Sequence, residues 1–175
     1  MKGLFKVGGG ALAASGILFA LVALLDFRTG PPPSTGAEIL LWRDSQAFVL
    51  SFVSEFLFFA TIFLIPGTIA LYQSLVDIDK TTPETATLVV MVFYGGLHVI
   101  YLLFAAATIV LSLAMTRGAY TKWIAYFGFA TAALDIIGSY PWAIGPILTL
   151  LCELSLAGWL VAVGSQLFRM RLSVA

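Results

Sequence analysis

The chain has too few charged residues to cover the surface of a water-soluble protein. Of its 175 residues, 10% are charged and 61% are hydrophobic, whereas a soluble domain carries about 25% charged residues. The mean hydropathy is +1.03. We therefore expect most of the outer surface to face the hydrocarbon of a lipid bilayer.

Cysteine and net charge are also scarce, and each scarcity excludes a class of protein. The single cysteine, Cys152, excludes an intrachain disulfide and a cysteine-based zinc or iron–sulfur site within one chain. Nine basic and nine acidic residues give a net charge of zero, so no basic surface is available for nucleic acid. The glycines "GGG" at 8–10 lack the strand–helix unit of a phosphate loop. We expect a protein without enzymatic activity, cofactor or nucleic-acid partner.

Five stretches are long and apolar enough to cross a membrane, which takes about 20 mostly apolar residues. They cover approximately 7–27, 46–75, 84–115, 123–138 and 144–168. The first follows a basic start but lacks the cleavage site of a signal peptide, so it is expected to be retained. The sequence predicts an all-α fold: a single polytopic membrane helical bundle over 1–175 with about five transmembrane helices, in a range of four to six.

Prolines and polar residues indicate where these helices end or bend. The prolines "PPP" at 31–33 stop the first helix, and "AEILLWRDSQ" at 37–46 has the composition of the headgroup zone and is expected to lead straight into the second. Pro66 removes a backbone donor, so the second helix should kink there. The residues "SYPW" at 139–142 break the chain before the last helix, whose first turn tolerates Pro146.

The basic residues of the short loops predict the orientation in the cell membrane. With five spans, one face holds six basic residues and the other holds three. The six are Arg28, Arg43, Arg117, Lys122, Arg169 and Arg171, and the three are Lys2, Lys6 and Lys80. Because cytoplasmic loops carry the excess of Lys and Arg, this count predicts a cytoplasmic C-terminus and an external N-terminus.

Four ionisable side chains lie well inside the predicted spans: Glu55, His98, Asp135 and Glu153. A carboxylate at the centre of a membrane helix costs about 2.5–3.5 kcal/mol, so each acid is expected to face the protein interior or to be protonated. Helical spacing places small residues beside two of them, as at helix contacts. Asp135 shares a stripe with Gly128, Thr131 and Gly138, and Glu153 shares one with Thr149, Ala157 and Gly164.

Asp135 and Glu153 are also predicted to lie at similar depths. At 1.5 Å per residue, they lie about 6 Å and about 10 Å from the face that carries 139–142. The tight connection between the last two helices makes these helices antiparallel neighbours. We therefore expect the two acids to meet and to share a proton or a hydrogen bond.

The sequence allows three roles for His98: a cofactor ligand, a hydrogen-bonded core residue, or a group that transfers protons. Tyr94 and Tyr101 share its helix face, and Gly95 and Gly96 adjoin it. The histidine could be an axial ligand to a haem or a chlorophyll-type pigment, with the glycines leaving room for the macrocycle. It could instead be a core residue that is hydrogen-bonded to a tyrosine or a glutamate, or it could transfer protons.

These observations favour a non-enzymatic integral membrane protein: a scaffold or accessory subunit whose partners are the lipid bilayer and other membrane subunits or further copies of itself. Two alternatives stay open. One is a protein that conducts protons or small ions through Glu55, His98, Asp135 and Glu153. The other is a subunit that holds a haem or chlorophyll-type cofactor with His98 as the ligand.

The last third of the chain resembles an uncharacterised family of prokaryotic multi-pass membrane proteins. The shared features are a proline, an apolar run, the sequence Glu-Leu-Ser-Leu, a tryptophan and a glycine near the helix end. Here these are Pro146, Glu153, Leu154, Ser155, Leu156, Trp159 and Gly164, and "YGGLHVIYLL" resembles the family's Gly-Leu-His stretch one helix earlier. The resemblance covers roughly 95–169. It implies a multi-pass architecture, usually of six spans, and brings no known activity.

Overall fold

The computed structural model describes residues 2–76, 97–118, 120–139 and 141–170, and this part of the chain contains helices and no strand. The all-α prediction is confirmed for these residues. The helices are α1 (Lys2–Thr29), α2 (Gly36–Ser45), α3 (Ala47–Val76), α5 (Leu97–Arg117), α6 (Lys122–Gly138) and α7 (Pro141–Arg169). Side chains are described for 3–75, 104–118, 120–139 and 143–170.

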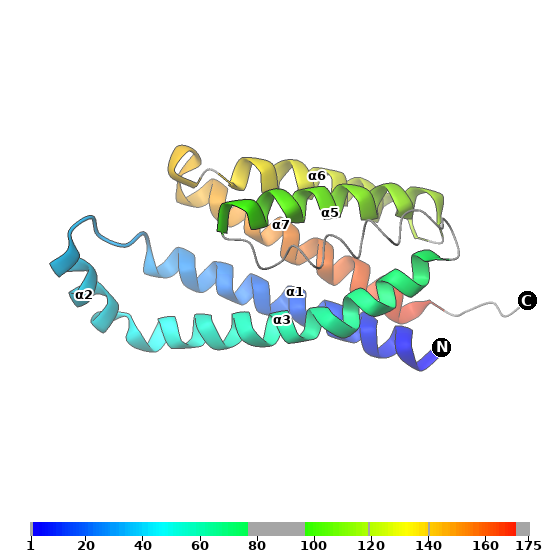
Figure 1. Ribbon diagram of the computed structural model, residues 1–175, viewed down its shortest axis with the longest axis horizontal. Helices are drawn as coiled ribbons and strands as arrows, with labels where there is room; N and C mark the ends of the chain where they lie inside the picture. Colours follow the sequence, from blue (N-terminus) through cyan, green and yellow to red (C-terminus); the bar gives the residue numbers. More distant parts are fainter. Residues whose placement is uncertain (1, 77–96, 119, 140, 171–175) are drawn as a thin grey trace, which may run out of the picture.

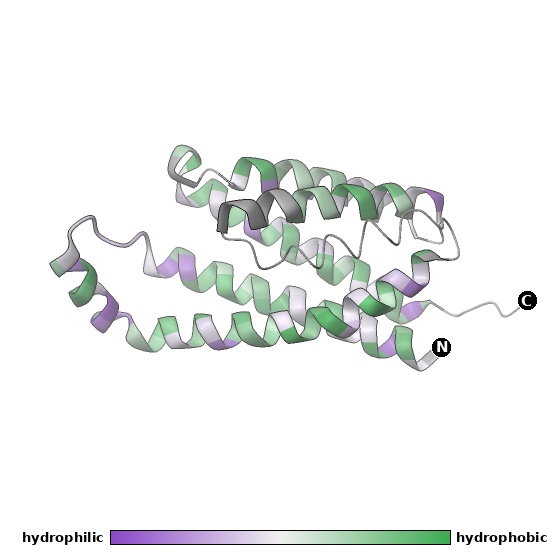
Figure 2. Ribbon diagram, in the orientation of Figure 1, coloured by the Kyte–Doolittle hydropathy of each residue, from purple (hydrophilic) through white to green (hydrophobic). Residues whose placement is uncertain are grey.

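Three of the described helices are long and apolar enough to cross a membrane: α1, α3 and α7. Phe104–Arg117 in α5 forms a shorter apolar helix. Outside α2 and the helix ends, the ribbons are mostly hydrophobic (Figure 2). The arrangement is therefore a helical bundle with at least three helices suited to a bilayer.

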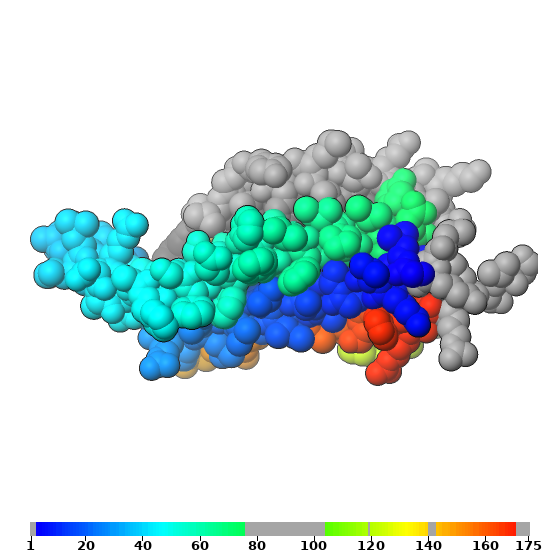
Figure 3. Space-filling view, turned by 90° about the horizontal axis from the view of Figure 1, so that it is seen from below, coloured from blue at the N-terminus to red at the C-terminus, as the bar shows by residue number. Residues whose placement is uncertain are grey.

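The helices α1 and α3 lie side by side and run in opposite directions (Figures 1 and 3). Gly67 allows the close approach of Leu12, because a Cβ at Gly67 would lie 3.0 Å from Leu12 Cδ1. Further along, the buried Ser15 hydroxyl donates a hydrogen bond of 2.9 Å to the carbonyl oxygen of Ala60. Small residues thus bring the two backbones together, as is usual between membrane helices.

The contact between α1 and α7 is closer still and joins the two ends of the chain. A Cβ at Gly164 would lie 2.5 Å from the backbone nitrogen of Ala13 and 2.6 Å from the carbonyl oxygen of Gly9. A Cβ at Gly16 would lie 2.6 Å from the carbonyl oxygen of Ala157. Backbone therefore meets backbone at points seven residues apart on each helix.

The three successive glycines of α1 have three different surroundings. Gly8 is packed against Pro66 and Ala70 of α3, Gly9 is packed against α7, and Gly10 has only one atom of Phe168 as near as 4.0 Å. Successive residues of an α-helix point about 100° apart, so neighbouring glycines reach different helices. The "GGG" segment is thus a packing element of a helix that contacts two others.

The helices α5 and α6 form a second pair that joins the bundle through α7 (Figure 1). Gly128 of α6 leaves space for Ser112 of α5 and for the indole of Trp159. The buried Trp159 Nε1 donates a hydrogen bond of 3.2 Å to the carbonyl oxygen of Ile124. Trp159 and Ile124 belong to the main apolar core, with Leu12 of α1.

The first turn of α1 and the last turn of α7 lie at the same end of the bundle (Figure 1). The antiparallel contact of α1 with α7 places Gly9 beside Phe168. We call this the termini end and the other, where α2 projects, the α2 end. The antiparallel packing of α1 and α7 argues against the prediction that the two termini lie on opposite sides of the membrane, and their locations stay a prediction. The expectation of opposite sides followed from an odd number of spans, and the sequence does not reveal that the last helix packs antiparallel to the first.

The helix boundaries agree with most of the predicted spans. The third predicted span, 84–115, is described only from Leu97, and its first part lies outside the described residues. The break before the last span centres on Gly145, whose φ of 74° interrupts α7 just before Pro146. The headgroup segment does not lead straight into the next helix, because it forms α2, which is separated from α3 at Gln46.

The predicted kink in the second span agrees with the shape of α3. The helix continues across Pro66 but changes direction in the half that contains this proline (Figure 1). The missing amide of proline removes one backbone hydrogen bond and its ring crowds the preceding turn, which accounts for the bend.

Candidate functional site

The polar stripe of α6 is buried, as the sequence predicted. Gly128, Thr131, Asp135 and Gly138 are all buried, and Asp135 is only 2% exposed. The Thr131 hydroxyl donates a long hydrogen bond of 3.4 Å to the carbonyl oxygen of Ser155 on α7. The stripe therefore faces the neighbouring helix and not lipid.

Asp135 lies against Cys152 of α7. A Cβ at Gly138, one turn further along α6, would lie 3.0 Å from Cys152 Cβ and 3.4 Å from its Sγ, and both Asp135 and Glu153 are near enough to act electrostatically on the Cys152 thiol. Asp135 Oδ2 is buried and has no hydrogen-bond partner in the described part of the chain. The carboxyl group is thus enclosed by the protein but incompletely satisfied.

Glu153 has an acidic neighbour on α1. The carboxylate that acts electrostatically on Glu153 is that of Asp26, near the end of α1. Adjacent residues of a helix differ by about 100° in direction, so Cys152 takes the side of α6 and Glu153 the side of α1. Ala157, one turn after Glu153, packs against Gly16 on that same side.

No hydrogen bond joins Asp135 and Glu153 in the described part of the chain, so their predicted contact stays a prediction. Their helices are antiparallel neighbours, as expected, but the residue of α7 that meets the Asp135 region is Cys152. The small-residue stripe of Glu153 is a close-approach face, yet the helix that approaches it is the first and not the fourth of the predicted spans. Asp26 was missed, although it lies only three residues before the end of α1 at Thr29.

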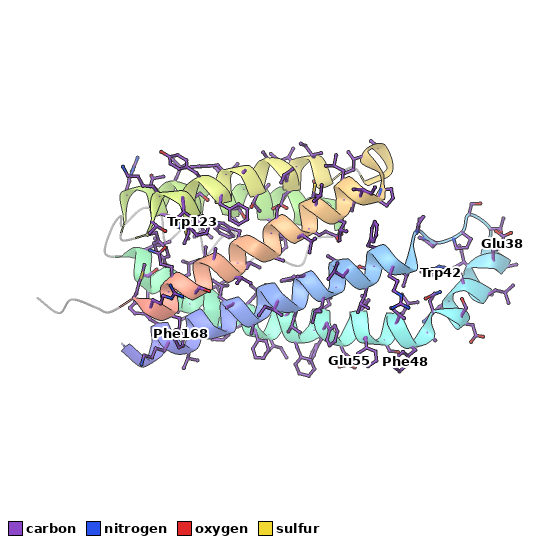
Figure 4. The ribbon with its side chains drawn as sticks, turned by 180° about the vertical axis from the view of Figure 1, so that it is seen from behind. Glu38, Trp42, Phe48, Glu55, Trp123 and Phe168 are labelled. Carbon is purple, nitrogen blue, oxygen red and sulfur yellow. The ribbon has the colours of Figure 1, made fainter. Side chains whose placement is uncertain are left out.

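Glu55 lies on the outer surface of α3, so of the two expectations for this acid, that it faces the interior or that it is protonated, the first does not hold. Its side chain is exposed and points away from the other helices (Figure 4). The packed side of α3 includes the buried Leu64. Leu64 follows Glu55 by nine residues. At about 100° per residue, this separation places the two side chains half a turn apart, on opposite sides of the helix.

His98 belongs to α5, but its side chain, together with Tyr94, Gly95 and Gly96, lies outside the described residues. Among the residues that are described, no group of three or more His, Cys, Asp or Glu side chains could hold a metal ion. The ligand role of His98 stays a prediction. A visible absorption band in the purified protein that is lost in His98→Leu would establish it.

The described acids thus form no single site. Asp135 is enclosed between α6 and α7, Glu153 faces Asp26 across the contact of α7 with α1, and Glu55 lies alone on the outside of α3. Comparisons of the chain with protein-family models, with curated proteins and with solved structures find no match.

Proposed function

We propose that this protein is a non-enzymatic subunit of a membrane assembly that offers a binding surface on α3. The observation that carries the proposal is the exposed Glu55 within an apolar helix face. Of the residues in the most apolar stretch of α3, only 11% are buried inside the molecule, whereas the share is 39% in α1 and also in α7. Figure 3 shows α3 on the surface beside α1 along its length.

Lipid alone is a poor environment for this face. A charged group that faces acyl chains at the centre of a helix costs about 2.5–3.5 kcal/mol. Glu55 is the ninth residue of α3 and therefore lies about 12 Å along the helix axis from Ala47. Exposed apolar side chains surround it, among them Phe52, Phe58 and Phe59. A protein partner would remove this cost and leave the apolar contacts in place.

The topology that we propose has both termini in the cytoplasm. The helices α1 and α7 are antiparallel, and both are long enough to cross the membrane. In this topology the chain as a whole crosses the membrane an even number of times. Of the basic residues in the described part of the chain, the termini end holds Lys2, Lys6, Arg117, Lys122 and Arg169, whereas the α2 end holds Arg28 and Arg43. Five basic residues against two favour a cytoplasmic termini end by the excess of Lys and Arg. Reporter fusions at each terminus test this, and opposite locations would contradict it.

Site-specific photo-crosslinking in native membranes tests the binding surface. A photoreactive side chain at position 58 on α3 should capture protein, because Phe58 is 59% exposed beside Glu55. The matched control is position 17 on α1, where Ile17 is 54% exposed, and it should capture lipid only. Capture of lipid alone from both positions would overturn the proposal.

Proton conduction is a second candidate function, favoured by one observation. The buried Asp135 Oδ2 lacks a partner among the described residues, and unsatisfied buried groups are frequently functional. Proton flux into proteoliposomes measures this directly. A flux that is lost in Asp135→Asn would support the candidate, whereas leakage equal to that of empty vesicles would remove it.

A further inference from the structure

We infer that the partner on α3 is a second copy of this chain, with two α3 helices packed together and Glu55 meeting Glu55. This inference rests on the proposed function, because it names the occupant of the same surface. The two copies would be related by a twofold axis along the membrane normal, the commonest symmetry of oligomers.

Depth in the membrane favours a second copy. Copies that are inserted in the same orientation place Glu55 at the same depth, so a twofold axis that passes near Glu55 brings the two carboxyl groups together. Any other partner would need a donor at this one depth. Glu55 is the only acidic or basic residue of α3, so no other charge on the helix competes for the contact.

The chemistry of the carboxyl group also favours a second copy. A protonated carboxylic acid carries one donor and an acceptor, so two such groups satisfy each other with two reciprocal hydrogen bonds. Neither group then needs to be charged in the hydrocarbon. The acid is in this respect complementary to itself, which an interface between identical surfaces requires.

The side chains next to Glu55 permit close approach. Ser51 and Ser54 lie one turn and one residue before it and are exposed on α3. Small side chains of this kind let membrane helices come near each other. Phe58 and Ile62, one and two turns after Glu55, are 59% and 42% exposed and supply apolar contact area on the same side.

Disulfide cross-linking in native membranes tests the inference. Ser51→Cys should give a covalent dimer on mild oxidation, whereas Ile17→Cys on the outer surface of α1 should not. The native Cys152 serves as the background in both, because it is buried at 3% exposure and should not cross-link. Equal dimer yields from the two variants would show random collisions and overturn the inference.

Substitutions of Glu55 test the hydrogen bonds in the Ser51→Cys background. Glu55→Leu should weaken dimerisation roughly tenfold, as the loss of two membrane hydrogen bonds predicts, and Glu55→Gln should preserve it because an amide also donates and accepts. An unchanged yield in Glu55→Leu would overturn the Glu55 contact. If position 58 captures a different protein while Ser51→Cys forms no dimer, the proposed function stands and this inference fails.

Discussion

Replacing Gly164 by alanine should destabilise the bundle by forcing the first and last helices apart. The new Cβ would lie 2.5 Å from the backbone nitrogen of Ala13 and 2.6 Å from the carbonyl oxygen of Gly9, whereas ordinary contact begins at 3.4 Å. One backbone must therefore move by about 0.9 Å, the difference between 3.4 and 2.5 Å. Neither atom belongs to a flexible side chain, so the whole helix contact has to shift. Overpacking of this kind costs about 1–3 kcal/mol.

Gly158→Ala is the matched control on the same helix. A Cβ at Gly158 would lie 3.5 Å from Cζ of Phe127, which is ordinary contact. Both substitutions raise helix propensity by the same amount, up to about 1 kcal/mol in water, so their difference isolates the packing term. We expect Gly164→Ala to be less stable than Gly158→Ala by about 1–3 kcal/mol.

Reversible unfolding in mixed micelles, followed by tryptophan fluorescence during a titration with denaturing detergent, measures the two free energies. The difference between the variants should appear as a lower midpoint for Gly164→Ala at an unchanged slope. A difference below about 0.5 kcal/mol, the usual scatter between independent sites, would refute the close contact of α1 with α7.

Three other substitutions or treatments test separate contacts. Trp159→Phe removes the hydrogen bond that Nε1 donates to the carbonyl oxygen of Ile124, so the free energy of unfolding should fall by at least about 0.5–1.5 kcal/mol; an unchanged midpoint in the same titration would contradict this. Burial raises the pKa of Tyr120 to about 12, although its hydrogen bond with Ser74 lowers it. Since the unfolded chain ionises near its ordinary value of 10.0, stability should fall as the pH rises from about 10 to about 12, and Tyr120→Phe should lose that part of the slope. Cys152 should react slowly with membrane-impermeant thiol reagents in intact membranes because it is buried, and rapid labelling would show an aqueous path to α7.

The sequence predicts the helices and one packed face well, because these depend on local patterns. Apolar length places α3 and α7 within a few residues of their observed bounds. The stripe of α6 that contains Asp135 is correctly assigned to the interior, since small and polar residues recur at helical spacing beside apolar ones.

The sequence fails where the answer depends on which helix fills a face. The small-residue stripe of Glu153 predicts a close neighbour, yet nothing local indicates that this neighbour is α1. A helix that is hydrophobic all round has no periodicity to distinguish its sides. This is the case for α3, so its sequence does not show that Glu55 lies on the exposed side of the helix.

The glycines of α1 show a third limit. Gly8 and Gly9 are adjacent in the sequence but contact different helices, so their spacing matches no single packed face. Their role becomes visible only when both neighbours of α1 are in place.

The contact of α1 with α7 also sets an order for biogenesis. Proteins are synthesised from the N-terminus, at about 5–20 residues per second, so α1 leaves the ribosome first and α7 last. The side of α1 that carries Gly9 and Gly16 packs against α7, so among the described helices it gains its partner only once α7 has been made. During this interval α1 can pair with α3 through Gly8 and Ser15, while its other side is open to lipid or to a membrane chaperone. A nascent chain that stops before α7 would keep that side uncovered, which gives the quality-control machinery of the membrane a feature by which to recognise it.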